Sequence, residues 1–237
     1  MPRFFVPDII GDNFILDGEN GKHAAKSLRM KVGEELILCS GNGDDYYAEI
    51  TEIIENNVHV NVTKKEKNAS ESCIKVHLLQ CLPKLDKMDF IIQKAVELGV
   101  YDITPVSSSR CVSQIGGKEL KKLDRWNKIS LEAAKQSGRG IIPKVLNPLK
   151  LKESLNVQKG DKIIFYEGKA DGFKEFLDKQ TEKDITILVG PEGGFSAQEV
   201  ELAKSFGFSS LSLGKRILRT ETASLCALSI IMYEKDN

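Results

Sequence analysis

Short apolar segments with strand-like alternation, separated by turns, dominate the first part of the chain. Only residues 23–30 have helical spacing there. The strand-like segments are residues 4–6, 13–16, 35–39, 46–54 and 58–62. A series of short strands of this kind predicts a small β-barrel or sandwich.

Beyond residue 73, strand-like and helical segments alternate. In residues 87–98, for example, Met88, Ile91, Ile92 and Ala95 recur on one helical face. The expected strands are 74–82, 102–106, 162–166, 184–189 and 209–213, and the expected helices are 87–98, 118–136, 172–179, 197–206 and 222–233. Strands separated by helices predict an α/β fold with a largely parallel sheet flanked by helices.

A polar segment separates these two patterns. Residues 63–72 contain a single apolar side chain, Ala69. This composition is typical of a domain linker. We therefore expect a β domain over residues 1–70 and an α/β domain over residues 73–237.

The net charge is zero, with 34 basic and 34 acidic side chains among 237 residues, so the total gives no indication of a nucleic-acid partner. The distribution is uneven, however, because residues 70–150 hold 14 basic and 8 acidic side chains. Two interpretations stay open for this basic region. It is either a solvated helix face or a positive surface that attracts phosphates.

Composition also narrows the chemistry. The five cysteines form no CxxC pair, and none of the three histidines has a partner at the spacing that metal binding requires, so we expect no metal site. The chain lacks an apolar run of roughly 18 residues, and its N-terminus does not resemble a signal peptide. We expect a cytoplasmic protein that does not enter the membrane.

Candidate chemistry lies where three of the later strands end. Residues 166–168, 190–194 and 214–216 follow apolar strands but are rich in glycine and charge. Ligands of parallel α/β sheets bind beyond the carboxyl ends of the strands. The three loops are therefore expected to form one pocket.

The middle loop is the most specific of the three. Gly190, Gly193 and Gly194 permit positive φ angles, and Ser196 with Glu199 predicts a capping box for the following helix. The alternative is a tight turn that only connects two elements. The dinucleotide pattern G-x-G-x-x-G is absent after every expected strand, which disfavours a nucleotide-dependent oxidoreductase.

The third loop gathers Lys215, Arg216, Arg219 and Glu221 just before an apolar helix. Unpaired amides at a helix start can hold a polar ligand group. A solvated basic turn is the competing interpretation.

Several ordered motifs together resemble the RsmE family, enzymes that methylate N3 of a uridine in small-subunit (16S) ribosomal RNA. The motifs are GPEGGFS at 190–196, LGKRILRTETA at 213–223, KLDKMDFIIQKAVELGV at 84–100, SSRC at 108–111 and EAAKQSGR at 132–139. The resemblance implies an N-terminal PUA-like β-barrel and a C-terminal SPOUT domain with a trefoil knot. It also implies a homodimer that binds S-adenosylmethionine in the knotted loops, with ribosomal RNA or the small ribosomal subunit as partner.

The resemblance also assigns roles to residues. Arg219 would stabilise negative charge on the uridine, and Glu221 would accept its proton, although a helix-capping or arginine-pairing role is equally open for Glu221. The residues expected to hold the cofactor are Glu167, Gly190, Glu192, Gly193, Leu213, Gly214, Ile217, Leu218 and Ala223. Those expected to contact RNA are Arg29, Lys84, Lys87, Arg110 and Arg139.

Two further functions remain as alternatives. One is a related SPOUT methyltransferase that modifies a ribose hydroxyl or another base, and the nucleoside it produces would reveal it. The other is a non-catalytic RNA-binding or ribosome-assembly factor, which would not bind S-adenosylmethionine.

Overall fold

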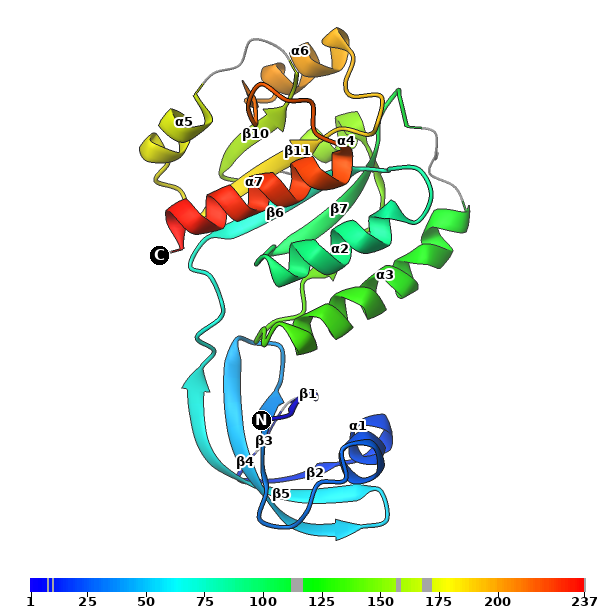
Figure 1. The fold of residues 1–237 in the computed structure, drawn as a ribbon, viewed down its shortest axis with the longest axis vertical. Coiled ribbons are helices and arrows are strands. Elements are labelled where there is room, and N and C mark those ends of the chain that lie inside the picture. Colours follow the sequence, from blue (N-terminus) through cyan, green and yellow to red (C-terminus); the bar gives the residue numbers. More distant parts are fainter. Residues whose placement is uncertain (8, 10, 112–116, 157–158, 168–171, 237) are drawn as a thin grey trace. The chain divides into compact units, whose positions relative to one another are not determined.

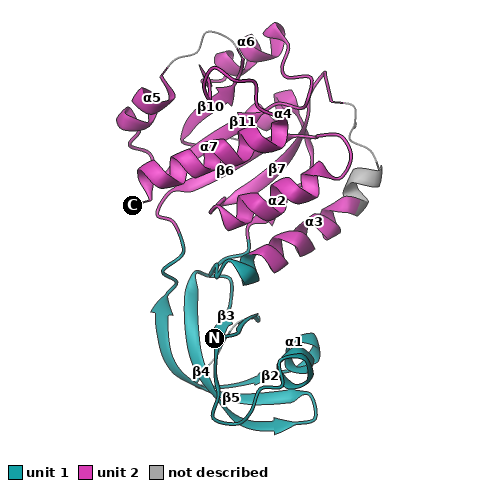
Figure 2. Ribbon diagram, in the orientation of Figure 1, with its two compact units in different colours: residues 1–71, 134–142 teal, residues 72–133, 143–237 magenta. Residues whose placement is uncertain are grey.

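The computed structural model describes residues 1–7, 9, 11–111, 117–156, 159–167 and 172–236. The chain forms two compact units (Figure 2). Unit 1 comprises residues 1–71 and 134–142, and unit 2 comprises residues 72–133 and 143–237. The return of residues 134–142 to unit 1 was not anticipated by the division at residues 70–73.

Unit 1 is built on a five-stranded sheet. Its order is β1 (Arg3–Phe5), β3 (Glu35–Cys39), β4 (Asp44–Ile54), β5 (Asn57–Lys67) and β2 (Asn13–Leu16). Strands β1 and β3 are parallel, and the other pairs are antiparallel. The short helix α1 (Gly18–Lys22) and a π-helical turn, η1 (His23–Ser27), lie between β2 and β3. Leu16, Leu36, Leu38, Ile50 and Val60 are buried in the core of this unit, as alternation along the strands predicts.

The predicted linker is wrong for residues 63–67, which belong to β5. These residues carry little apolar surface, but β4 pairs with them as far as the match of Asp44 with Lys67. The Asp44 carboxylate lies 2.9 Å from Lys65 Nζ and 2.5 Å from Lys67 Nζ. Backbone pairing and neutralised charge thus hold a strand that hydrophobic periodicity could not reveal.

Residues 134–142 are tied to the end of the first segment by hydrogen bonds. The Glu71 carboxylate accepts bonds from the amides of Gly140 (2.7 Å) and Ile141 (3.0 Å) and from the Arg139 guanidinium. Asn68 donates to the Gly138 carbonyl at 3.1 Å. Polar contacts of this kind leave no periodic signal in the sequence.

Unit 2 contains a seven-stranded sheet in which every pair is parallel, as predicted. Its order is β12 (Ser209–Leu211), β10 (Asp161–Phe165), β11 (Asp184–Val189), β6 (Lys75–Cys81), β7 (Asp102–Ser107) and β8 (Lys144–Val145), with β9 (Leu149–Lys150) also paired to β7. Strands β8 and β9 were not predicted, because two residues are too short to show alternation.

Helices cover both faces of this sheet (Figure 1). Helix α7 (Thr220–Lys235) packs against α2 (Lys87–Glu97), β6 and β11, and α5 (Phe173–Lys179) also contacts α7. A buried cluster on the other face joins Leu79 and Cys81 of β6 to α4 (Leu151–Asn156) and α6 (Ala197–Ser205). Helix α3 (Gly117–Gln136) contacts α2 through a hydrogen bond from Trp126 to Asp89.

These features confirm an α/β fold with a parallel sheet between helices, and no helix in the described ranges is long and apolar enough to cross a bilayer. The trefoil knot stays a prediction from the resemblance.

A histidine bridges three strands at the amino edge of the sheet in unit 2. His77 of β6 lies 2.9 Å from the Asp102 carboxylate of β7 and 3.0 Å from that of Asp184 on β11. Burial alone would lower the pKa of His77, but hydrogen bonds to the two carboxylates outweigh it and raise the pKa above 6.5. The stabilisation is therefore complete at pH values below the unfolded pKa, and it is lost as pH rises through the folded pKa.

We predict that His77→Gln lowers the stability of unit 2 more at pH 5.5 than at pH 9, by a difference on the order of 1 kcal/mol. Urea unfolding at the two pH values measures this difference. Asp184→Asn should reproduce part of the pH dependence, because it removes one of the two carboxylates. An equal loss of stability at both pH values would contradict the bridge.

Candidate functional site

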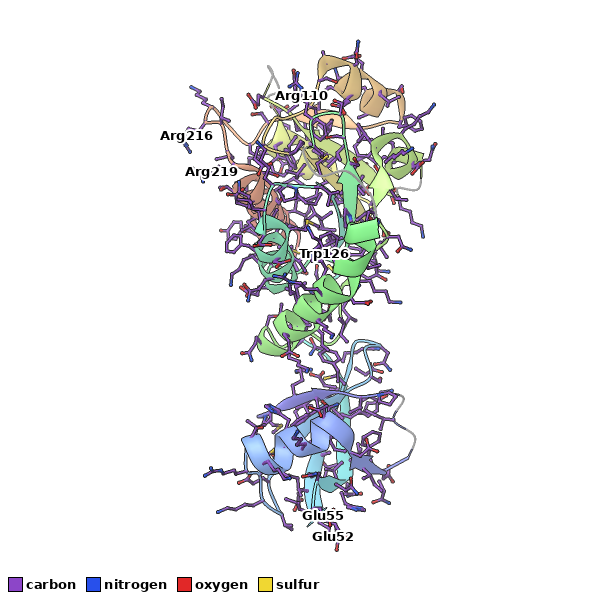
Figure 3. All side chains as sticks on the ribbon, turned by 90° about the vertical axis from the view of Figure 1, so that its right-hand side faces the viewer. Glu52, Glu55, Arg110, Trp126, Arg216 and Arg219 are labelled. Atoms are coloured by element: carbon purple, nitrogen blue, oxygen red, sulfur yellow. The ribbon has the colours of Figure 1, made fainter. Side chains whose placement is uncertain are left out.

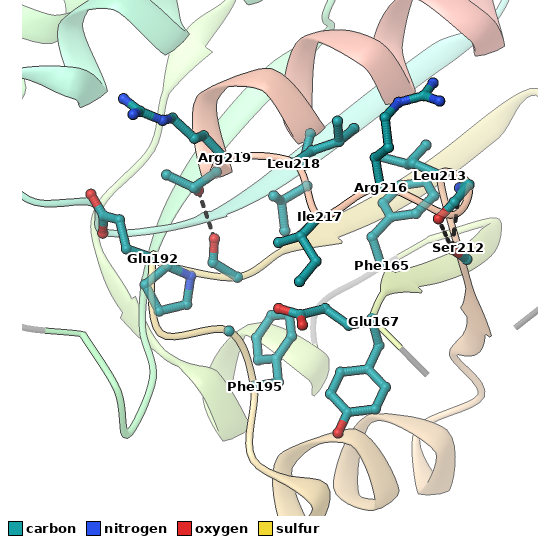
Figure 4. A pocket seen from close by; sticks show the side chains of 18 of the residues that line it. Phe165, Glu167, Glu192, Phe195, Ser212, Leu213, Arg216, Ile217, Leu218 and Arg219 are labelled. Carbon is teal, nitrogen blue, oxygen red and sulfur yellow. Dashed lines mark hydrogen bonds between the residues drawn. The ribbon is translucent and has the colours of Figure 1, made fainter. Parts of the chain in front are cut away.

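Three loops meet at the carboxyl edge of the sheet because β12, β10 and β11 are neighbours. They enclose a cavity of about 290 Å³ (Figure 4), close to the lower end of the ~300–1,000 Å³ typical of small-molecule sites. The walls come from residues 165–167 at the end of β10, residues 189–192, 194 and 195 at the end of β11, and residues 212–220 after β12, with Ala223 of α7. The expectation that these loops converge is confirmed.

Glycine shapes the walls in two ways. Gly194 (φ 62°) and Gly214 (φ 114°) occupy the left-handed region, which side chains rarely adopt. Gly190 and Gly193 have ordinary backbone angles, so the expectation of positive φ is right only for Gly194 within that loop. A Cβ at Gly190 would instead lie 3.1 Å from the Phe195 ring, and one at Gly193 would lie 3.2 Å from Arg110 Cβ. Close packing explains these two glycines.

A buried polar network fixes the floor of the cavity to α7. The Thr220 hydroxyl donates to the Gly190 carbonyl at 2.6 Å and accepts a 2.9 Å bond from the Gln80 amide. Ser224 donates to the Gln80 side-chain oxygen. Gln80 and Ser224 are fully buried and Thr220 is 5% exposed, so an unmade bond here would be costly. The network thereby sets the position of the glycine loop.

The outer side of the glycine loop is held by the segment after β7. Ser196 and Glu199 form the predicted capping box of α6, and the Ser109 amide also donates to Glu199 at 2.7 Å. Burial opposes ionisation of Glu199, but hydrogen bonds from Ser109 and Ser196 outweigh it and lower the pKa of this carboxyl. Arg110 donates to the Gly193 carbonyl at 2.9 Å. Two backbone segments far apart in sequence therefore support each other beside the cavity.

A second ionic group lies where α2 and α7 begin. Lys87 Nζ is 3.1 Å from a carboxylate oxygen of Glu192 and 3.2 Å from one of Glu221. Glu192 also accepts the Lys84 amide at 3.1 Å. Burial opposes ionisation of Glu192, but hydrogen bonds from its own amide, Lys87 and Lys84 lower its pKa. The bond to Glu192 is the main reason that the pKa of Lys87 is raised.

Four charged side chains around the cavity are exposed and have no ion pair within the described residues: Glu167, Lys215, Arg216 and Arg219. Figure 4 shows Arg219 on the same side of the cavity as Glu192, with Arg216 at the other end. Figure 3 places Arg110, Arg216 and Arg219 toward one end of unit 2. The site therefore offers both signs of charge to a ligand.

Most of the predicted site residues lie together. Glu167, Gly190, Glu192, Leu213, Gly214, Ile217, Leu218, Arg219 and Ala223 line the cavity. Gly193 lies behind it against Arg110, and Glu221 faces Lys87. Lys84 and Arg110 are exposed beside the glycine loop, and Arg29 is exposed in unit 1.

Arg139 differs from the other predicted RNA contacts, because it is 3% exposed and pairs with Glu71 inside unit 1. We therefore leave it out of the RNA-contact set. Gln80, Thr220 and Ser224 were not among the predicted site residues. Gln80 had a signal, since a polar residue inside an apolar strand implies a buried partner. No group of metal-ligating side chains is found in the described part of the chain.

Two segments of the chain match known protein families. Residues 70–232 match an RNA methyltransferase domain, and residues 16–63 match an RNA methyltransferase PUA domain.

Individual relatives match nearly the whole chain. The ribosomal RNA small subunit methyltransferase E of Bacillus subtilis is 35% identical over 94% of this chain and 91% of its own length. A crystal structure of that enzyme from Neisseria gonorrhoeae, bound to S-adenosyl methionine, is 34% identical with a TM-score of 0.89, covering 98% of this chain and 97% of its own. A methyltransferase from Legionella pneumophila in complex with the same cofactor is 34% identical with a TM-score of 0.85, covering 98% and 96%.

The motifs around the glycine loop, the parallel sheet that carries them and the full-length matches agree: this chain belongs to the family of ribosomal RNA small subunit methyltransferase E.

Proposed function

We propose that this protein transfers a methyl group from S-adenosylmethionine to N3 of a uridine in 16S ribosomal RNA. The observation that carries the proposal is a cavity in which glycine main chain lies beside the guanidinium of Arg219, which has no ion pair with any described residue. A related enzyme with another target atom would share the cavity, so the position of the methyl group is the point to test.

The cavity offers charges that complement those of the cofactor, in a volume of about 290 Å³. S-adenosylmethionine carries a cationic sulfonium, an ammonium and a carboxylate, and the cavity presents Glu167 and Arg216 unpaired within the described chain. Gly190, Gly194 and Gly214 carry no side chains into the cavity and leave main-chain donors and acceptors for the adenosine. We propose that Gly193, behind this wall, supports the same loop. We propose that Glu167, Glu192, Leu213, Ile217, Leu218 and Ala223 complete this site. When bound, the cofactor supplies the methyl group.

On the RNA side, Arg219 would stabilise the negative charge that develops on the uridine base. Removing the imide proton of uridine places negative charge on the carbonyl oxygens, and a positioned guanidinium stabilises that charge. Arg219 is the N-cap residue of α7, so the network around Thr220 fixes its backbone. Glu221 as proton acceptor stays a prediction, and its ion pair with Lys87 disfavours that role.

We propose that Lys84 and Arg110 bind RNA phosphates beside the cavity and that Arg29 binds them in unit 1. All three are exposed, and the first two border the loop that contains Glu192 and Gly193. The homodimer, the assembled small subunit as partner and the cytoplasmic location remain predictions.

The function is tested with purified protein, S-adenosylmethionine labelled in the methyl group, and small-subunit RNA. Digestion to nucleosides and mass spectrometry should place the label in 3-methyluridine. Label in a 2′-O-methylated nucleoside would favour a different target atom. An absence of both transfer and cofactor binding would favour a binding protein without enzymatic activity.

Arg219→Ala should lower kcat about 100-fold, because it removes a preorganised donor for the developing charge. Binding of S-adenosylmethionine, measured by calorimetry, should change little. Arg219→Lys is the matched variant and should give an intermediate rate, because it keeps the charge and loses the planar fork. Wild-type turnover in Arg219→Ala would refute the role.

Thr220→Val should weaken cofactor binding about tenfold, equivalent to about 1.4 kcal/mol, because the Gly190 carbonyl and the Gln80 amide lose their shared partner. Thr220→Ser keeps the hydroxyl and should bind almost as the wild type does. Calorimetric titration of the three proteins measures the effect. Equal affinity for all three would show that the network does not position the cofactor loop.

RNA binding should weaken with salt, and Lys84→Gln and Arg110→Gln should each reduce the slope of log K against log salt by about 1. Arg139→Gln serves as the contrast. It should leave the slope unchanged while costing about 3 kcal/mol of stability, because Glu71 loses its counter-charge in a largely buried site and keeps only the Gly140 and Ile141 amides as donors among the described residues. A reduced slope in Arg139→Gln alone would reverse this assignment.

A further inference from the structure

Lys87 stands between two carboxylates at the edge of the cavity. Its side chain is 28% exposed, and those of Glu192 and Glu221 are 26% and 17% exposed. The contacts join the first residue of α2, the glycine loop after β11 and the first turn of α7. An ammonium held by two half-buried carboxylates has little freedom to reach a phosphate.

Glu221 depends on this contact more than Glu192 does. Its Oε2 atom is buried and has no aligned hydrogen bond in the described structure, so the Lys87 ammonium 3.2 Å away is its compensating charge. Glu192 has the Lys84 amide as a second partner. Removing Lys87 would therefore leave Glu221 as the less well compensated of the two anions.

Glu221 is close in sequence to Arg219, so a charge on Glu221 that lacks a partner would affect Arg219. Arg219 and Glu221 are two residues apart where α7 begins, and an uncompensated carboxylate in the first turn would attract the guanidinium at the N-cap. Arg219 has no ion pair within the described residues. An ion pair between Lys87 and Glu221 would explain why Arg219 has none, because it neutralises the carboxylate that would otherwise pair with Arg219.

We propose that Lys87 is a positioning residue that neutralises Glu221, and with it Glu192, so that the guanidinium of Arg219 stays free for the anionic uridine. The inference rests on the proposed methyl transfer. In this proposal Lys87 forms ion pairs within the protein and does not contact an RNA phosphate. Glu221 is a partner of Lys87 and not a proton acceptor.

The test is a set of variants with kcat and KM measured for methyl transfer to RNA. Lys87→Met should lower kcat about tenfold by allowing Glu221 to pair with Arg219, with a smaller change in the KM for RNA. Lys87→Arg should keep most of the rate, because it retains the charge. Adding Glu221→Gln to Lys87→Met should restore most of the lost rate, because it removes the competing anion.

Lys94→Met is the matched control. Lys94 lies on the same helix and pairs with Glu97, away from the cavity, and its loss should leave kcat unchanged. Lys87→Gln provides a second version of the test if Lys87→Met is too unstable to assay.

The outcomes separate the alternatives. A higher KM for RNA with unchanged kcat, a smaller salt slope and no rescue by Glu221→Gln would mean that Lys87 binds phosphate, and would overturn the proposal. A rate loss that Glu221→Gln does not restore would overturn it as well. If the wild-type protein transfers no methyl group, the proposed function itself fails. Wild-type turnover in Lys87→Met refutes only the inference about Lys87.

Discussion

The hydrogen bond from the Thr220 hydroxyl to the Gly190 carbonyl is the contact on which the site depends. It joins the glycine loop after β11 to the first residue of α7, and the buried Gln80 amide fixes the hydroxyl from the sheet side. Residues 212–219 contain no helix or strand, so their path is set by where α7 begins. The loop that carries Arg219 and the loop that carries Glu192 therefore keep a common position through one shared partner.

Local pairing decides which charges can act, and net charge does not reveal it. The chain is neutral in total, and its basic region, residues 70–150, contains cations with different partners. Arg139 forms an ion pair with Glu71 within unit 1, and Lys94 pairs with Glu97 on the surface of α2. Lys87 pairs with two carboxylates. Arg219 lies outside this basic region. It lines the cavity and has no ion pair in the described structure. An enzyme that acts on a polyanion thus needs no large positive total if a few cations are kept free at the right place.

The sequence predicts features that repeat or that follow local rules. Strand-like segments in the sequence located β2 and β11 with their observed bounds, and the Ser196–Glu199 spacing predicted the capping box. The glycine loops were correctly placed on one edge, because parallel strands end together. The order of the strands, with β10 between β11 and β12, was not predicted. The cavity at their ends contains most of the cofactor residues proposed from motifs.

What escaped prediction rests on contacts between residues distant in sequence. Residues 63–67 form a strand because their backbone pairs with β4, where Asp44 neutralises Lys65 and Lys67. Residues 134–142 return to unit 1 through Glu71 and Asn68. Arg139 belongs to a basic run yet is buried, and Gly190 is needed for contact with Phe195 and not for its φ angle. None of these contacts has a periodicity, so only the folded arrangement reveals them.

The most direct measurement is mass spectrometry of 16S ribosomal RNA from cells of the source organism with and without the gene for this protein. The account predicts that one 3-methyluridine disappears in its absence and returns when the wild-type protein is supplied, but not when Arg219→Ala is supplied. An unchanged modification pattern without the protein, or full restoration by Arg219→Ala, would contradict the account.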